Sequence, residues 1–241
     1  MRNMYPGFFD PYQRSMPSEQ LSGVWNAIVT NTKDPENLGR VKLKFPSREG
    51  ELETDWVRVA TLMGGSGKGS LFIPDVNDEV LVAFLMGRLD QPVVIGSLWS
   101  KQDKPPPGDT NNEIKKIKTK YGHEITFNDK ESEGSITIKT KKGHSIILSD
   151  KDGSVKAESA DKQHSLELDE TGKKVTVKSG TSKVELTSSG NVTISGTQSL
   201  SVKAPEVKLE ASASMSIKST GMLDIKSDGM INIKGSMVKI N

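Results

Sequence analysis

The C-terminal half of the chain repeats a short pattern in which one polar residue separates two apolar residues. Alternation of this kind is typical of β-strands with one buried face. Successive pairs lie about 9–11 residues apart, and the interval shortens to about 8 near the end, which predicts a repeat architecture of one short strand and one turn per unit. The pairs are Ile125/Phe127, Ile136/Ile138, Ile146/Leu148, Val155/Ala157, Leu166/Leu168, Val175/Val177, Val184/Leu186, Val192/Ile194, Leu200/Val202, Val207/Leu209, Met215/Ile217, Leu223/Ile225, Ile231/Ile233 and Val238/Ile240.

A strand that offers only two inward side chains cannot bury them alone, so the repeats must stack within one chain or between chains. A wide single-chain solenoid would need large side chains inside, but no aromatic residue follows Phe127. The sequence therefore favours an all-β structure whose repeats stack between chains, with a thin aliphatic core shared around a threefold axis. A flat β-sandwich is the alternative, and it would need more varied strand lengths. The predicted trimer core comprises Ile136, Ile138, Ile146, Leu148, Val192, Ile194, Leu223, Ile225, Ile231 and Ile233.

Residues 20–100 show a different pattern, with short alternating or fully apolar runs between turn signals. Five strands with no helical stretch predict a small closed barrel, and the OB-fold is the common five-stranded solution. We expect the three tryptophans, Trp25, Trp56 and Trp99, in its core, and a loop at Gly64 to Gly69. The candidate strands are Val24–Thr30, Arg40–Phe45, Asp55–Ala60, Glu79–Leu85 and Val93–Ser97.

Composition changes abruptly along the chain and divides it into four parts. Every aromatic residue lies between Tyr5 and Phe127, and the last arginine is Arg88. Between the aromatic-containing part and the repeats lies a Pro-rich and then polar stretch, Lys101 to Asn112, which suits a semi-rigid linker. The predicted parts are an N-terminal arm (residues 1–19), an OB-fold collar (20–100), a linker (101–113) and a β-helical needle (114–241).

Overall composition excludes several classes of function. The chain of 241 residues has 33% hydrophobic residues, a net charge of +2 and no cysteine. This balance does not favour nucleic acid as a partner, and the absence of cysteine excludes thiol catalysis and cysteine-based metal sites. The longest apolar run, Val80 to Met86, is far shorter than the roughly 20 residues of a membrane span. The N-terminus lacks a signal-peptide pattern, so we expect synthesis in the cytoplasm without a signal peptide.

Candidate catalytic and metal-binding residues are few, and none forms a recognised pattern. The three histidines, His123, His144 and His164, each lie two residues before an apolar pair, where a corner residue that hydrogen-bonds the turn is the simpler interpretation than an axial His₃ site. The GGSGKG stretch lacks phosphate-loop spacing, and the sequence holds no GxSxG elbow. The sequence therefore predicts no enzyme, no metal and no cofactor.

Several segments together resemble one known family. They are NTKDPENLGRVKLKFP at Asn31–Pro46, DWVRVAT at Asp55–Thr61 and the run Leu71–Trp99, followed by YGHEITFND from Tyr121 and KKGHSIILSD from Lys141. These segments resemble phage baseplate assembly protein V and the VgrG-type central spikes of contractile tails and type VI secretion. The resemblance covers roughly residues 20–241. It implies an all-β homotrimer in which an OB-fold collar is followed by a needle, an intertwined triangular β-helix (β-prism) made by three chains.

The resemblance implies a non-enzymatic spike that docks on a hub and pierces the target cell envelope. Because few residues precede the OB-fold, we expect the hub to be a separate protein at the OB end, and the short linker leaves no room for an enzyme domain. The chain stops inside a repeat, so we expect a PAAR-like cap on a sticky tip formed by Met237, Val238 and Ile240. The location would be a virion tail baseplate or a bacterial injection apparatus. The alternative function is a carbohydrate-binding adhesin module on a β-solenoid stalk.

Overall fold

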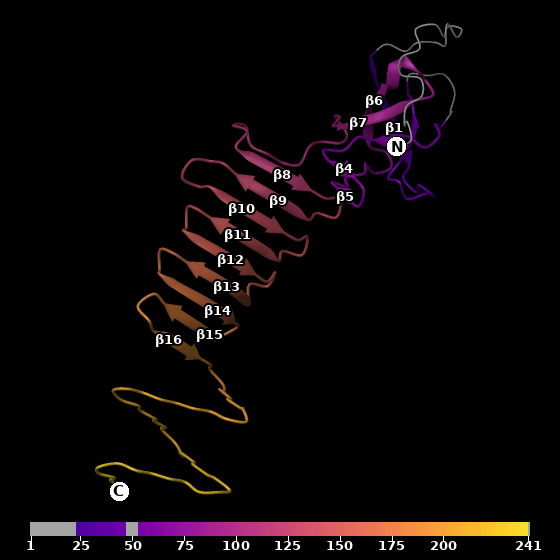
Figure 1. Ribbon diagram of the computed structural model, residues 1–241. Coiled ribbons are helices and arrows are strands. Elements are labelled where there is room, and N and C mark those ends of the chain that lie inside the picture. The colour runs from indigo at the N-terminus through magenta and orange to yellow at the C-terminus, as the bar shows by residue number, and fades with distance from the viewer. Residues whose placement is uncertain (1–22, 47–52, 241) are drawn as a thin grey trace, which may run out of the picture. The chain divides into compact units, whose positions relative to one another are not determined.

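The computed structural model describes residues 23–46 and 53–240, and it confirms the all-β class (Figure 1). Apart from one short 3₁₀ turn, η1 (Leu85–Gly87), every regular element of this part is a β-strand. The described chain divides into two compact units, and the division lies between Asp152 and Gly153. The predicted N-terminal arm, residues 1–19, lies outside the described residues.

The first unit begins with a five-stranded sheet in the order β2-β1-β6-β7-β3. Neighbouring strands are antiparallel except β3 and β7, which are parallel. A pair of main-chain hydrogen bonds between Val41 and Val57 links the segment before β2 to the segment before β3, so the two ends of the sheet meet as in an OB barrel. The strands are β1 (Val24–Asn31), β2 (Lys42–Lys44), β3 (Arg58–Val59), β6 (Glu79–Phe84) and β7 (Pro92–Leu98).

Alternating side chains of these strands form the one fully buried core of the described chain. In β6, every second residue is buried, and the continuous apolar run from Val80 predicted a buried strand here. Trp25 lies edge-on to Phe45 and Phe84, with ring centroids 6.4 Å apart in both pairs. The buried hydrophobic residues are Ala27, Val29, Val41, Leu43, Val57, Val80, Val82, Phe84 and Val94.

The barrel differs from the sequence prediction at three places. The strand expected at Asp55–Ala60 shortens to β3, because only Arg58 and Val59 pair with β7. The expected loop at Gly64 to Gly69 contains a small hairpin of β4 (Gly64–Gly65) and β5 (Lys68–Gly69). Two of the tryptophans expected in the core lie outside it: Trp99 is 71% exposed because it follows the end of β7, and Trp56 is half-buried with the Nζ of Lys42 5.5 Å from its ring centroid.

The rest of the first unit is an antiparallel meander in which each strand pairs with the next (Figure 1). All pairings run in register over the full five residues of each strand, and tight turns join them. The predicted repeats at 125–148 are therefore strands. They are β8 (Ile114–Lys118), β9 (Glu124–Asn128), β10 (Ser135–Lys139) and β11 (Ser145–Ser149).

The second unit opens with the same arrangement. Strands β12 to β16 pair consecutively and antiparallel, and every predicted apolar pair from Val155 to Ile194 lies on one of them. The strands are β12 (Ser154–Glu158), β13 (His164–Asp169), β14 (Lys174–Ser179), β15 (Ser182–Thr187) and β16 (Val192–Ser195).

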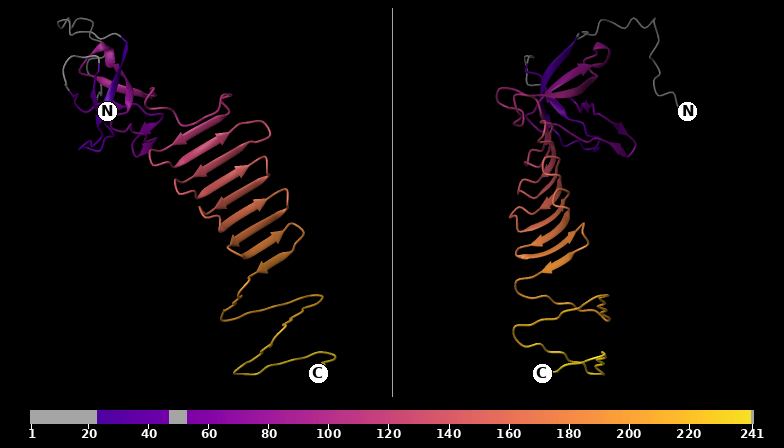
Figure 2. Two further views of the ribbon diagram at one scale, coloured as in Figure 1. Left: turned by 180° about the vertical axis from the view of Figure 1, so that it is seen from behind. Right: turned by 90° about the vertical axis from the view of Figure 1, so that its left-hand side faces the viewer.

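Residues 197–240 have no strand and no main-chain hydrogen bond to another main-chain group. The chain runs back and forth in wide turns without pairing (Figure 2), and every residue of this segment is exposed. The sequence predicted strands here, from Leu200/Val202 to Val238/Ile240. In the single chain these pairs have no neighbouring strand, which is the physical reason for the difference.

The barrel core gives the first testable prediction. Leu43 is completely buried, so Leu43→Ala should lower the free energy of unfolding of the barrel by about 2–5 kcal/mol through lost burial and a cavity. Urea unfolding followed by tryptophan fluorescence measures it, since all three tryptophans lie between residues 25 and 99. Leu71→Ala is the matched control, because Leu71 is 80% exposed, and an equal loss in both variants would contradict the core assignment.

Candidate functional site

One face of the meander in the first unit is an uncovered apolar surface, which we call the apolar ladder. Ile136 lies opposite Phe127 and Leu148, and Ile138 lies opposite Ile125 and Ile146, so the side chains form two continuous columns. Ile136, Ile138, Ile146 and Leu148 are each 38–46% exposed, although all four are large apolar side chains. A surface of this length on a single-layer sheet is typical of a face that another polypeptide covers.

The opposite face of the same strands is mainly polar and carries ion pairs. Glu124 lies 4.0 Å from the Nζ of Lys116 and 3.7 Å from that of Lys118. Thr126 and Thr137 lie opposite each other, and Ile114 and Ile147 are the apolar exceptions on this face. The polar face is therefore compatible with contact with water, whereas the apolar ladder is not.

The apolar ladder pattern continues on the strands of the second unit. Val192 and Ile194, two predicted core residues on β16, lie opposite Leu186 and Val184 and are 64% and 58% exposed. The polar face of this unit carries an ion pair between Lys156 and Glu158 of 2.7 Å. The hydrogen bond to this carboxylate raises the pKa of Lys156.

The remaining predicted core residues lie in the unpaired segment 197–240. Leu223, Ile225, Ile231 and Ile233 are 49–71% exposed. The predicted tip residues are also exposed, with Met237 at 76%, Val238 at 53% and Ile240 at 90%. In the single chain these apolar side chains are exposed to water, which is unfavourable. Their main-chain groups form no hydrogen bond with other main-chain groups, which would be unfavourable in any contact that excludes water.

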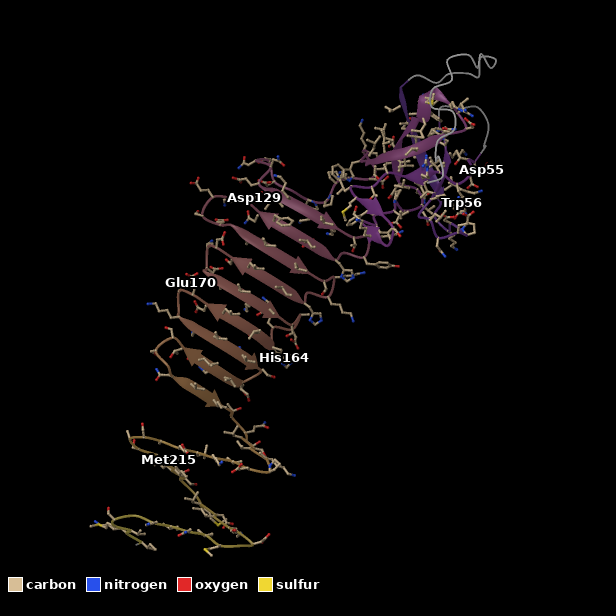
Figure 3. The ribbon with its side chains drawn as sticks, viewed as in Figure 1. Asp55, Trp56, Asp129, His164, Glu170 and Met215 are labelled. Atoms are coloured by element: carbon tan, nitrogen blue, oxygen red, sulfur yellow. The ribbon has the colours of Figure 1, made fainter. Side chains whose placement is uncertain are left out.

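The histidines lie beside turns and take part in local hydrogen bonds. The ring Nδ1 of His123 accepts the main-chain N–H of Lys141 at 3.4 Å, and Nδ1 of His164 lies 2.9 Å from the hydroxyl of Ser179. Figure 3 shows His164 and Glu170 at opposite edges of the second unit's strands. In the part of the chain that the structure describes, no group of three or more histidine and acidic side chains is placed to hold a metal ion.

Sequence reasoning missed that two of these turns are copies of each other. Residues 119–123 and 140–144 share the pattern Thr-Lys-x-Gly-His. In both, the threonine N–H donates to the histidine carbonyl, and the glycine N–H donates to the threonine carbonyl. Gly122 and Gly143 have φ of 88° and 101°, which favours glycine. The repeated pentapeptide was the signal that could have identified them.

The loop before β2 is held by a buried carboxylate, which sequence reasoning also missed. Asp34 is the one buried charged residue of the described chain, and it accepts hydrogen bonds from the Nε and Nη2 of Arg40 at 3.0 and 2.7 Å. It also accepts main-chain N–H groups of Glu36 and Leu38. The Arg40 guanidinium, with these N–H groups, holds the pKa of Asp34 well below its usual range.

Exposed apolar side chains also gather on the loops around the β4/β5 hairpin. Leu62 is 97% exposed, Met63 56%, Leu71 80% and Phe72 68%. We call these four residues the loop patch. Large apolar side chains exposed on neighbouring loops of a small barrel suit a contact surface rather than a core. The described residues include no helix that is long and apolar enough to cross a membrane.

Comparison with known families identifies the barrel. Residues 25–99 match the family described as the type VI secretion system/phage-baseplate injector OB domain. This range runs from the second residue of β1 to the residue after β7. It contains the Asp34 loop and the loop patch. The fold and the sequence therefore point to the same family for this part of the chain.

Individual relatives extend the likeness beyond the barrel. The chain is 32% identical over 139 residues to the type VI secretion system spike protein VgrG3 of Vibrio cholerae, covering 52% of this chain and 14% of that protein. It is 33% identical over 137 residues to VgrG2a of Pseudomonas aeruginosa, covering 51% and 16%. It is also 29% identical over 150 residues to the actin cross-linking toxin VgrG1 of V. cholerae, covering 56% and 14%. The chain thus spans about a seventh of the length of these relatives.

The Asp34 loop gives the second prediction. Asp34→Asn removes the ion pair with Arg40 and should lower the stability of the barrel at pH 7. Because the folded-state pKa of Asp34 is depressed, its stabilising effect is present above the unfolded-state pKa of about 3.9 and is lost as the pH falls toward the folded-state value. The difference between variant and wild type should therefore shrink below about pH 4.

Urea midpoints at pH 7 and pH 3 measure this difference. Asp90→Asn is the matched control, since its ion pair with Arg88 at 2.7 Å is solvent-exposed and should contribute little. A difference for Asp34→Asn that stays constant between the two pH values would contradict the charged role of Asp34.

Proposed function

We propose that this chain is the central spike of a contractile tail or injection machine, because residues 25–99 match the injector OB-domain family and the chain is 32–33% identical to type VI secretion spike proteins over 137–139 residues. In this proposal three copies assemble around a threefold axis. The barrels form a collar, and the repeats from residue 114 onward form the needle.

The observation that carries the proposal is the state of residues 197–240. Their apolar pairs recur every 7–8 residues, yet the segment has neither a hydrogen bond between main-chain groups nor a buried side chain. Main-chain N–H and C=O groups in a folded protein are almost always hydrogen-bonded. Strands contributed by two further copies would supply both the hydrogen bonds and the apolar contacts that one chain lacks.

The same arrangement accounts for the paired strands. Three sheets that turn their apolar ladders toward a common axis bury the half-exposed columns of Ile136, Ile138, Ile146 and Leu148, and leave the polar faces with their ion pairs in water. The strands β8 to β11 hydrogen-bond within their own chain. Intertwining of chains is therefore proposed for residues 197–240, and side-by-side packing for the sheets before it.

The proposed action is mechanical rather than catalytic. A needle whose strands are joined along its length by hydrogen bonds, with a dry aliphatic core, resists bending, and contraction of a sheath would drive it through the target envelope. The toxin name of one relative describes that protein, whose likeness covers 14% of its length, and supports no such activity here. The collar would dock on a hub, for which the loop patch is the suitable apolar surface.

The proposed needle also offers a binding surface at its end. Met237, Val238 and Ile240 are exposed, and the main chain around them has no partner. A cap of the PAAR-repeat kind, stacked on three such strands, would cover the apolar side chains and satisfy the strand edges.

Trimer formation gives the third prediction. Leu148→Asp places a carboxylate in the apolar ladder, so burial between three sheets should become too costly and the protein should no longer be trimeric at micromolar concentration. Ile147→Asp is the matched control, because this neighbouring residue lies on the polar face. Light scattering should give three chain masses for the wild type and for Ile147→Asp. A folded wild-type monomer, or equal damage from both variants, would contradict the proposal.

The tip gives the fourth prediction. Ile240→Asp should abolish binding of a cap protein, while Lys239→Asp, on the adjacent exposed residue, should leave most of the binding. Pull-down with a purified PAAR-repeat protein measures it. Electron density of assembled particles that shows no extra polypeptide beyond residue 240 would contradict the cap.

A further inference from the structure

The two edges of the first unit's meander carry opposite charges. The turns at 119–123 and 140–144 lie at one edge and contain Lys120, Lys141 and Lys142 with no acidic residue, a net charge of +3. The turns at 129–134 and 150–152 lie at the other edge and contain five carboxylates against two lysines, a net charge of −3. We call these the basic edge and the acidic edge. Figure 3 shows Asp129 on the acidic edge.

Most of this charge is not neutralised within the described chain. Lys141 and Lys142 on the basic edge are exposed and make no ion pair with the described residues. Asp129, Glu131 and Asp150 on the acidic edge are likewise exposed and without an ion pair there. Some charges do have partners: Lys120 lies 3.5 Å from Asp75, and Glu133 lies 3.0 Å from Lys130 and 3.9 Å from Lys151.

One chain cannot bring its own two edges together. Each strand of the meander has five residues, and at about 3.3 Å per residue this separates the edges by roughly 16 Å. The sheet is a single layer that does not close on itself. A partner that neutralises both edges at once must therefore present a negative surface to one and a positive surface to the other, and a second copy of this chain has both.

The geometry of a threefold assembly brings unlike edges together. In a threefold assembly whose axis is parallel to the stacking direction of the strands, rotation superimposes each sheet on the next without turning it upside down. The basic edge of one copy therefore meets the acidic edge of its neighbour. Such a head-to-tail contact closes after three copies. Two like edges would meet only if one copy were turned upside down.

Resting on the trimer proposed above, we propose that the basic edge of each copy pairs with the acidic edge of the next, with Lys141 and Lys142 facing Asp129, Glu131 and Asp150. Along the stacking direction, the turn between β10 and β11 lies between the two acidic turns, and a pure rotation preserves this height. The lysines therefore face carboxylates above and below them.

This pairing determines which edges meet and at what height, whereas the apolar ladder supplies most of the attraction. The apolar columns repeat from strand to strand and would tolerate a shift by one hairpin. Complementary charges favour one arrangement and disfavour like-charged ones. Because such contacts lie at the corners of the prism, near water, salt should weaken them.

Zero-length carbodiimide cross-linking of the full-length wild-type protein tests the pairing directly. We expect products of two and three chain masses in which Lys141 or Lys142 is joined to Asp129, Glu131 or Asp150, identified by peptide mass spectrometry. A zero-length link between these edges cannot form inside one chain. A trimer by light scattering that yields none of these links would overturn the edge pairing while leaving the trimer intact. A wild-type monomer would overturn the proposed function itself.

Charge reversal provides an independent test. Lys141→Glu with Lys142→Glu should lower the melting temperature of the trimer by at least about 3 °C relative to a control with the same charge change in the linker, Lys101→Glu with Lys104→Glu. Adding Asp129→Lys and Glu131→Lys should restore most of this loss. Equal melting of the edge variant and the linker control, or no recovery in the quadruple variant, would overturn the proposal.

Discussion

The structure depends on one constraint: extended main chain and apolar side chains both need neighbours, and a thin strand array provides them only in part. The barrel meets the constraint alone, because its sheet ends meet at Val41 and Val57 and its alternate side chains are buried. The meanders satisfy their main-chain groups but leave one apolar face open. Residues 197–240 satisfy neither. The need for a partner therefore increases along the chain. In the proposed trimer, the meanders gain apolar contacts, and residues 197–240 gain both apolar contacts and hydrogen bonds.

Polar contacts have a different role from the apolar ladder. Ion pairs on the polar face, such as Lys118 with Glu124, are partly exposed and contribute little stability each, but they keep that face compatible with water. The buried pair of Asp34 and Arg40 does something else, since it satisfies main-chain N–H groups in a loop that has no strand neighbour of its own. Charges at the two edges of the first meander act through their arrangement, because neither edge has a local counterpart.

Much of the fold could be predicted from alternation alone. Val24–Thr30 and Glu79–Leu85 match β1 and β6 closely, and in both strands the buried residues recur at every second position. Alternation cannot tell whether a strand's neighbour belongs to the same chain, so the pairs from Leu200 onward were predicted as strands that the single chain does not form. Nor could it show the charged edges, because the sign of an edge emerges only when it is known which turns lie together. The placement of Trp99 was wrong since an apolar run does not reveal where its strand ends.

The different demands of the two needle segments have a consequence for how a trimer would hold together. In the meanders, main-chain hydrogen bonds survive without partners, so three preformed sheets can meet through their ladders and edges. In residues 197–240, hydrogen bonds and apolar contacts form together and only between chains, so that segment orders as a unit or not at all. The register fixed by the sheets decides which strands of the later segment lie side by side. Correct pairing at the charged turns near Lys141 would thus also determine which apolar pairs of residues 197–240, up to Ile240, lie side by side.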